Sequence, residues 1–396
     1  MQYSQFERHI AEIITYWSPA VDFDNGGVFY NMEPVRHSIE IPGRKAFLMH
    51  VRQLYNFSVG SEMGLPGAKK IAKHLYASVD KVFDRTGGLY PFVPEYNSGP
   101  HRRFGGLFTS YNQWYFITAA ARYSKAFGDA KAFHRAFGHF KLVKEAFSTG
   151  DFPRLGIYRV KNMDNGSVSG KTGNDHLHHF EALVHLAEAA ETVLKRPEYE
   201  AVKKELGEYV DEAEAMFESK LLDKDSFMTP DSMEEDLSFA KRGHVTTLGH
   251  PLEWFGFLFE AQRHMKRPSP VLERHGRRIL DENLSLALSD TGCFRSVYEF
   301  DSKRVYPKTD FWSQVEGILG ALYGHVYFGD EQYLLMAETM WEFYRRTMCD
   351  PVHGGIYEQV SEDGIPVSYT KGSVWKCDHH ALRVCEKIIR YRLLDR

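Results

Sequence analysis

Apolar residues recur every three or four positions along twelve stretches of the 396-residue chain. This spacing places them on one face of a helix, so it predicts twelve helices and an all-α fold class. The predicted helices span residues 2–17, 45–60, 66–84, 110–127, 130–147, 175–195, 197–218, 250–266, 269–286, 309–327, 330–348 and 376–395.

The links between these helices alternate between short and long, and loops as long as the long ones are usually functional. The long links are residues 18–44, 85–109, 148–174, 219–249, 287–308 and 349–375. Five of them contain a glycine turn followed by apolar and aromatic residues, a pattern that predicts a short strand or hairpin. The five occurrences are Gly26-Gly27-Val28-Phe29, Gly87-Gly88-Leu89-Tyr90, Gly156-Ile157-Tyr158, Gly292-Cys293-Phe294 and Gly354-Gly355-Ile356-Tyr357. The link 219–249 has only Ser226-Phe227-Met228 at that place.

The repeat between these turns is between sixty and seventy residues long, so each unit holds two helices. Six such pairs predict an (α/α)6 barrel with short β-hairpins in the long loops at one end. We expect one catalytic domain over residues 1–396. One helix of each pair lines the inside, and the long links meet the N-termini of the inner helices. The alternative is an open helical solenoid.

Composition narrows the class of protein. With 43% hydrophobic residues, 26% charged residues and a net charge of -4, the chain has an ordinary globular composition without a nucleic-acid footprint. The four cysteines form no CxxC pair, which favours a reducing compartment and packing roles. No window reaches about 18 uninterrupted apolar residues, and the first residues lack a signal-peptide core. We therefore expect a cytoplasmic protein that does not span a membrane.

One hexapeptide marks the start of the eighth predicted helix, Gly249-His250-Pro251-Leu252-Glu253-Trp254. Proline suits a first helical turn, so His250 lies at the helix N-terminus, with Glu253 one turn later on nearly the same face. The partial positive charge there disfavours an imidazolium and predicts a neutral base near pH 7. The alternative is a His–Glu pair that only caps a buried helix.

The barrel geometry predicts that polar residues in the first turns of the inner helices converge on one pocket. These residues are Arg52; Tyr111 and Gln113; Asn174, His176, His178 and Glu181; His250 and Glu253; Lys308, Trp312, Gln314 and Glu316; and Trp375, His379, His380 and Arg383. Two neutral histidines across a cavity suit proton abstraction next to a carbonyl, and an arginine stabilises the developing enediolate. The glutamates have the alternative role of capping or tying helices, and Arg383 is expected to anchor a carboxylate in the wall.

Aromatic residues offer a further means of holding a sugar. Trp114, Trp254, Trp312 and Trp375 are candidates for stacking on the apolar face of a sugar, although two or more of them are expected in the core.

Two other chemistries fit parts of this set. His176, His178 and His179 with His379 and His380 offer zinc ligands, but positions two apart on a helix face different directions. A glycosidase would place two carboxylates, such as Glu253 and Glu316, across a cleft, which leaves the histidines unexplained.

Several motifs together resemble the N-acylglucosamine 2-epimerase superfamily, which includes cellobiose 2-epimerases and mannose isomerases. The motifs are Asp24-Asn25-Gly26-Gly27 with Arg52, the Asn174-x-His-x-His178-x-x-Glu181-Ala182 segment, Gly249-His250-x-x-Glu253-Trp254, Lys308-x-x-x-Trp312-x-Gln314-x-Glu316, and Trp375-Lys376-x-x-x-His380-x-x-Arg383. The resemblance covers nearly the whole chain. It implies the (α/α)6 fold independently, and no metal or redox cofactor is expected in this superfamily.

The resemblance also implies residue roles. His250 and His380 look like the two acid/base residues that move the C2 proton through a cis-enediol(ate), and Arg52 looks like the group that holds the oxyanion. His178 looks like a substrate-binding histidine, and Glu253 and Glu316 look like partners that orient histidines. By position we also place His176, Asn174, Tyr111, Trp312 and Trp375 at the substrate.

The chain departs from the family at three places. His379 stands where relatives carry tyrosine or phenylalanine, Leu48 stands where they carry tryptophan, and the segment 91–109 is unusual. These changes bear on the identity of the substrate more than on the reaction.

The resemblance of the Lys308-to-Glu316 and Trp375-to-Arg383 motifs favours a neutral free aldose of the mannose or β-1,4-disaccharide type. Alternatives are an aldose–ketose isomerase, an N-acylglucosamine 2-epimerase and a non-catalytic protein-binding member. The expected partner is a small sugar, and the subunit state is monomer or homodimer.

Overall fold

The computed structural model describes residues 1–30, 45–83, 85–91, 107–148, 151–239 and 244–395. Twelve long helices dominate it. The six inner helices are α2 (Phe47–Glu62), α4 (Ser110–Phe127), α7 (Gly173–Val193), α9 (Gly249–Met265), α11 (Phe311–Phe328) and α13 (His379–Arg390). The six outer helices are α1 (Tyr3–Trp17), α3 (Ala68–Val82), α5 (Ala130–Phe147), α8 (Arg196–Met216), α10 (Pro270–Ala287) and α12 (Glu331–Thr347). Shorter turns are η1 (Ser18–Ala20), α6 (Phe152–Leu155) and η2 (Phe217–Leu221).

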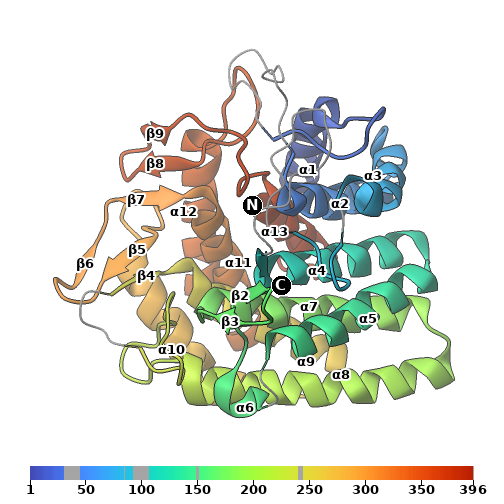
Figure 1. Ribbon diagram of the computed structural model, residues 1–396. Helices are drawn as coiled ribbons and strands as arrows, with labels where there is room; N and C mark the ends of the chain where they lie inside the picture. Colours follow the sequence, from blue (N-terminus) through green and yellow to red (C-terminus); the bar gives the residue numbers. More distant parts are fainter. Residues whose placement is uncertain (31–44, 84, 92–106, 149–150, 240–243, 396) are drawn as a thin grey trace.

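The inner helices form a closed ring, in which α2, α4, α7, α9, α11 and α13 pack in that order and α13 returns to α2. Each outer helix packs on its inner partner, and α1 packs on α13, so both ends of the chain meet (Figure 1). This arrangement is the predicted (α/α)6 barrel, which the structure confirms. A closed ring excludes the open solenoid.

Burial explains which helix of each pair lies inside. Helix α2 is buried without interruption from Phe47 to Gly60, because it has a neighbour on each side and another behind it. Outer helix α3 buries only the stripe that contains Ile71, Leu75 and Val79 and exposes lysines on its other face. An apolar stripe of this width is typical of a helix that covers a core from outside. No helix among the described residues is long and apolar enough to cross a membrane.

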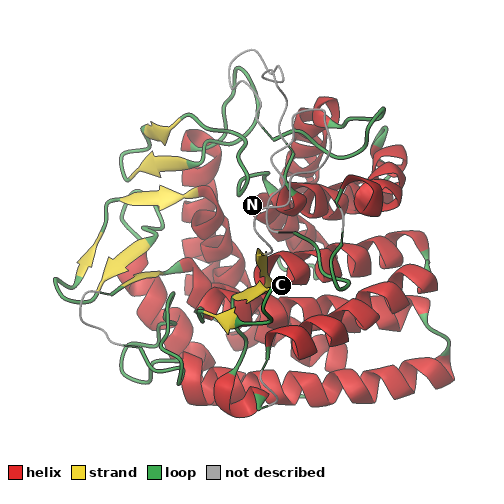
Figure 2. Cartoon of the chain, viewed as in Figure 1, coloured by secondary structure: helices red, strands yellow, loops and turns green. Residues whose placement is uncertain are grey.

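The short strands lie among the long links (Figure 2). They are β1 (Leu107–Thr109), β2 (Val160–Asn162), β3 (Val168–Ser169), β4 (Val245–Thr247), β5 (Val297–Glu299), β6 (Arg304–Val305), β7 (Lys308–Asp310), β8 (Gln359–Ser361) and β9 (Pro366–Ser368). They form three antiparallel sheets, β1-β2-β3, β4-β5-β6 and β7-β8-β9. In each sheet, the strand that leads into one inner helix pairs with a hairpin from the next long link. The sheets therefore tie successive loops together where the inner helices begin.

The glycine turns behave differently from the prediction. Instead of forming the hairpins, four of them close through isolated bridges, such as Thr86 with Leu89 and Leu288 with Phe294, while the named hairpins lie later in the links.

The last helix is also shorter than predicted. It begins at His379 because Asp378 adopts a positive φ of 58° and is ion-paired with Lys376, and it ends at Arg390.

The end of the barrel opposite the long links is closed by a buried ion-pair cluster. Lys387 of α13 contacts Glu260 at 2.7 Å, and Lys125 contacts Glu188 at 2.6 Å. Arg390 pairs with Glu62 at 3.0 Å, and Arg122 and Glu386 join the same cluster. Residues from four inner helices, α2, α4, α7 and α9, thereby connect to α13.

This cluster predicts a loss of stability in acid. Although burial opposes it, the charges of Arg390, Lys387 and Arg122 lower the pKa of Glu386 from 4.5 to about 2. The pKa of Glu188 is likewise lowered by its cationic partners, although burial opposes the shift. A carboxylate with a lowered folded pKa contributes stability that is complete above its unfolded pKa and is lost as the pH falls toward the folded value.

We expect these carboxylates to contribute a part of the free energy of unfolding, measured by urea titration, that is complete above pH about 5.5 and falls below pH about 4.5, by up to about 1.4 kcal/mol per pH unit for each carboxylate. Glu386→Gln should flatten that slope. An equal slope in the variant would contradict the assignment of acid sensitivity to this cluster.

Candidate active site

A cavity of about 180 Å³ opens among the first turns of the inner helices. It is lined by Arg52, Tyr111, Asn174, His178, His250, Glu253, Phe311, Trp312, Trp375 and His380. Nine of the eleven residues assigned to catalysis or substrate binding line this cavity, and the other two, His176 and Glu316, do not. Six further first-turn residues that were expected to converge there also do not line it: Gln113, Glu181, Lys308, Gln314, His379 and Arg383. The structure therefore brings the two candidate acid/base histidines to one small space, as the geometry of the ring predicts.

His250 is the second residue of α9. Its Nδ1 lies 2.9 Å from Oδ1 of Asp231, and its ring lies 5.0 Å from the ring of Trp312 between centroids. Gly249 allows this approach of α9 to α11, because a Cβ there would lie 2.7 Å from a ring carbon of Trp312. With Nδ1 engaged by a carboxylate, Nε2 is the ring nitrogen left for a substrate.

Asp231 was missed by the sequence analysis. It comes from the link between η2 and β4, which lacks the glycine turn and has no helical periodicity. Although burial raises its pKa, the charge of His250 and hydrogen bonds from His250 and Thr247 outweigh this effect and hold the pKa of Asp231 below its usual value. The only available signal was the departure of this link from the repeat.

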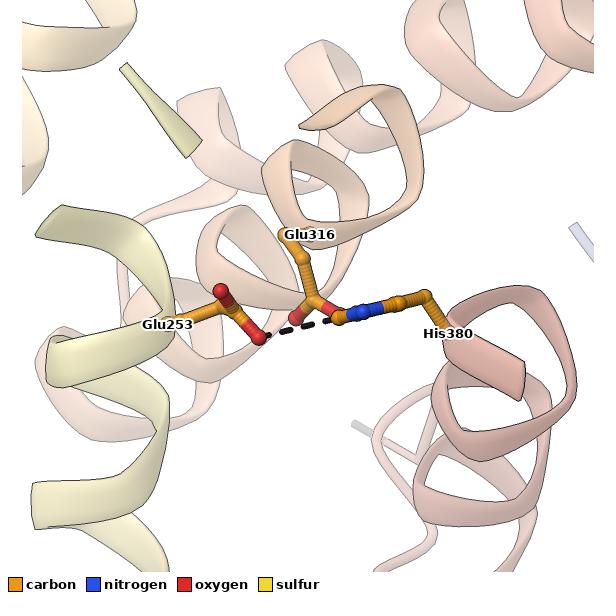
Figure 3. A group of neighbouring side chains, drawn as sticks. All are labelled: Glu253, Glu316 and His380. Carbon is orange, nitrogen blue, oxygen red and sulfur yellow. Dashed lines mark hydrogen bonds and ion pairs between the residues drawn. The ribbon is translucent and has the colours of Figure 1, made fainter. Parts of the chain in front are cut away.

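His380 is likewise the second residue of its helix, α13. Its Nδ1 lies 2.9 Å from Oε1 of Glu316 and 3.6 Å from Oε1 of Glu253 (Figure 3). Burial, reinforced by the charges of Arg52 and Arg383, holds the pKa of His380 well below its usual value. The imidazole is therefore neutral near pH 7, and its Nε2 is suited to accept a proton.

The carboxylates behind His380 share one cation. Arg383 donates to Glu316 at 2.6 Å and to Glu253 at 3.3 Å, and its Nε lies 3.9 Å from Glu181. Burial and the neighbouring Glu316 raise the pKa of Glu253 well above its usual value. Arg383 thus anchors the wall, as predicted, and Glu253 faces His380 and the cavity rather than forming a pair with His250.

Arg52 presents a positive charge to the cavity. It donates to the hydroxyls of Tyr111 at 2.9 Å and Tyr115 at 2.7 Å, and to the carbonyl of Trp375. These accepting oxygens are neutral, so the charge of the guanidinium is not cancelled by the groups that hold it. Such a group stabilises an oxyanion that develops within reach.

His178, which is on α7, lies beside Arg52 of α2. Glu181 holds its Nδ1 at 2.7 Å, and its Nε2 lies 3.5 Å from the hydroxyl of Tyr115. Burial lowers the pKa of His178, although Glu181 opposes the shift. One turn earlier, Asn174 lines the cavity, and its buried Oδ1 accepts no hydrogen bond from the described residues. Both side chains line the cavity with polar groups.

His176 does not contact the cavity, which corrects its predicted role. Its Nδ1 lies 2.8 Å from the carbonyl of Thr172, and its Nε2 accepts from the amide of Ile157 at 2.9 Å. Gly156, with a φ of +64°, leaves room for this ring, because a Cβ there would lie 2.3 Å from Nε2. His176 therefore fastens a glycine turn to α7.

Two other first-turn residues make the same kind of contact. Gln113 bonds to both backbone groups of Tyr90, and Gln314 bonds to the amide of Phe294 and the carbonyl of Gly292. Both hold glycine turns and do not line the cavity. The predicted stacking residues also divide, because Trp114 and Trp254 are buried in the core, whereas Trp375 is 47% exposed at the rim.

The zinc set considered from the sequence does not gather at one point. His176 is engaged by backbone groups, and His179 packs between Trp114 and Phe140. Glu253, Glu316 and His380 bring ligand atoms within 4.8 Å of one another, but Arg383 already supplies a cation to both carboxylates. This geometry favours a guanidinium, rather than a metal ion, as their partner.

A second chamber of about 280 Å³ continues from the cavity. The two share Tyr111, Asn174, His250 and Trp375, and the second chamber adds Thr109, Arg159, Thr172, Asp175, Asp231 and Ser232. Most of the residues that line this chamber are of polar types, and it adjoins His250.

The fold and the site define a helical barrel with two carboxylate-backed imidazoles facing one cavity. The chain belongs to the N-acylglucosamine 2-epimerase family, whose sequence profile matches residues 27–382. It is 25% identical to a cellobiose 2-epimerase of Ruminococcus albus, with 98% of each chain covered.

Among solved structures, that of a cellobiose 2-epimerase from Spirochaeta thermophila superimposes with a TM-score of 0.86 at 20% identity, covering 99% of this chain and 97% of that one. A D-mannose isomerase superimposes with a TM-score of 0.84 at 19% identity, covering 98% and 97%. These likenesses support the barrel fold.

Proposed function

We propose that this protein is a carbohydrate 2-epimerase that acts at C2 of a free neutral aldose through proton transfer by His250 and His380. The observation that carries the proposal is the placement of both imidazoles on one cavity, each with Nδ1 on a carboxylate and with Arg52 in the same wall. Family membership supports the same reaction class.

The reaction follows from these positions. In the open-chain aldose, one imidazole Nε2 takes the C2 proton, and the electron pair of the broken C–H bond forms a C1–C2 double bond. The carbonyl oxygen becomes an oxyanion, which Arg52 stabilises. The other imidazole, when protonated, returns a proton to the opposite face of C2 and gives the 2-epimer. Delivery to C1 instead, with transfer of the O2 proton to O1, would give a ketose.

The second chamber bears on the size of the substrate. In the second chamber, a sugar unit attached to the reacting aldose would contact mainly polar residues, and Trp375 lies at the junction of the two spaces. A partly exposed indole offers an apolar face for stacking on a sugar ring. We therefore propose a β-1,4-linked disaccharide with a free reducing end as one substrate, and mannose as the smaller alternative.

Turnover in deuterated water tests the proposal. We expect mannose, cellobiose or mannobiose to give a product that carries deuterium at C2 if it is the epimer, or at C1 if it is the ketose, because the imidazole that returns the proton carries a deuteron taken from the solvent. Mass spectrometry and proton NMR of the separated sugars measure this label, and N-acetylglucosamine completes the panel.

An incubation without enzyme is the control. Product without label throughout would contradict solvent-exchanging acid/base chemistry, and cleavage of a disaccharide to monosaccharides would indicate a hydrolase instead.

A further inference from the structure

We infer that Asp231 is a positioning residue for His250: it fixes the imidazole with Nε2 toward the substrate and balances the positive charge when that nitrogen takes a proton. The inference deepens the proposed function and rests on it. It concerns a residue outside all the motifs that carry the family resemblance.

The carboxylate of Asp231 is held by two neighbouring parts of the chain at once. Its Oδ1 meets Nδ1 of His250 at 2.9 Å, and its Oδ2 accepts from the hydroxyl of Thr247 at 2.7 Å. Thr247 ends β4, α9 begins two residues later at Gly249, and His250 is its second residue. The carboxylate therefore spans the junction between this strand and the helix.

The backbone around Asp231 is fixed independently of His250. The hydroxyl of Thr246 donates to the carbonyl of Thr229 at 2.5 Å, and the amide of Met233 donates to the carbonyl of Lys171 at 3.1 Å. The start of α7 also lies against this segment, because a Cβ on Gly173 would meet the carbonyl oxygen of Pro230 at 2.1 Å. The fold thus places the carboxylate, and the carboxylate then places the ring.

The chemical consequence follows from the two ring nitrogens. A carboxylate at Nδ1 selects the tautomer with hydrogen on that nitrogen, which leaves the lone pair on Nε2. When Nε2 takes the C2 proton, the imidazolium carries hydrogen on both nitrogens and Asp231 stays ionised. No proton passes to the carboxylate, and its role is orientation and charge balance, as in other histidine–carboxylate pairs.

On the opposite side of the cavity, His380 is also paired with a carboxylate, but that carboxylate is more deeply buried than Asp231. Glu316 holds Nδ1 of His380 at 2.9 Å and is 2% exposed, and it shares Arg383 with Glu253. Asp231 has a side chain that is 31% exposed and lines the second chamber. Two histidine–carboxylate pairs thus face one sugar, and each imidazole can serve as base in one direction and acid in the other.

Steady-state kinetics of Asp231→Asn and Asp231→Ala test the inference, with the sugar that gives the fastest turnover in deuterated water. We expect kcat to fall about ten- to a hundredfold, the range for loss of a group that orients a functional histidine. KM should change by less than about threefold, and the isotope effect with C2-deuterated sugar should be retained or increase. Asp236→Asn is the matched control, because this carboxylate of the same link is exposed and accepts hydrogen bonds from Ser238 rather than from a histidine.

The double variant Asp231→Ala with His250→Ala distinguishes a role of Asp231 in orienting His250 from a role that is independent of His250. If Asp231 acts through His250, the double variant should be no slower than His250→Ala alone. Unchanged kcat in both Asp231 variants, a loss confined to KM, or a full additional loss in the double variant would each overturn the inference. Full activity of His250→Ala would instead reject the proposed function, and the inference with it.

Discussion

Alanine at His250 or at His380 is expected to lower kcat by about 10²- to 10⁴-fold, the range for removal of a general acid or base. Each imidazole faces the same cavity from a different helix, His250 from α9 and His380 from α13, so neither can take the place of the other. Both proton transfers are needed for epimerisation, so either loss should stop turnover at the corresponding step. Chromatography of the sugar products measures the rate.

Thermal unfolding should change little in these variants. His250→Ala removes one hydrogen bond at a partly exposed position, and His380→Ala leaves Glu316 paired with Arg383. The matched control is His134→Ala, because that histidine lies on outer helix α5 with its side chain 50% exposed. Near-normal kcat in either active-site variant would reject the role assigned to that histidine.

Arg383→Met is expected to cause the largest loss of stability, about 3–5 kcal/mol at neutral pH, the range for breaking a buried ion pair from one side. Arg383 is 1% exposed and lies among Glu181, Glu253 and Glu316. Its removal leaves these carboxylates buried without their shared cation. Urea unfolding followed by circular dichroism measures the free energy.

Adding Glu316→Gln to Arg383→Met should recover part of the loss, because one uncompensated carboxylate is then removed. The control is Arg392→Met, since that side chain is 74% exposed and its ion pair is with the nearby Asp395, so its loss should leave the unfolding midpoint almost unchanged. If Arg383→Met and Arg392→Met unfold alike, the buried carboxylates do not depend on Arg383.

The helices of the barrel could be predicted from the sequence because each buries a face with a regular period. Helix α4 was predicted at 110–127 and occurs at Ser110–Phe127. The start of α13 was not predictable in this way, because it depends on the tertiary contact of Trp17 with Asp378 just before His379. The places of the hairpins were also missed, since pairing between successive links sets them.

For the site, the sequence predicted the residues that lie in first turns of inner helices. The first-turn residues that line the cavity can be distinguished from those that contact loops only by applying the rotation of about 100° per residue of an α-helix. His176 lies two positions from both Asn174 and His178, about 200° around the helix, and this alone excludes a shared face. Asp231 was beyond reach, because no periodicity relates a loop residue to the ring it contacts.

The alternation within these first turns has an evolutionary consequence. Tyr111, Asn174 and Trp312 line the cavity, and the residue two positions after each one is hydrogen-bonded to a loop. The residues that line the cavity and the residues that hold the loops thus lie on different sides of the same helical turns. Selection can exchange a cavity residue for one that suits another sugar without loosening the loop beside it, so one barrel is able to diversify its substrates while its architecture is maintained.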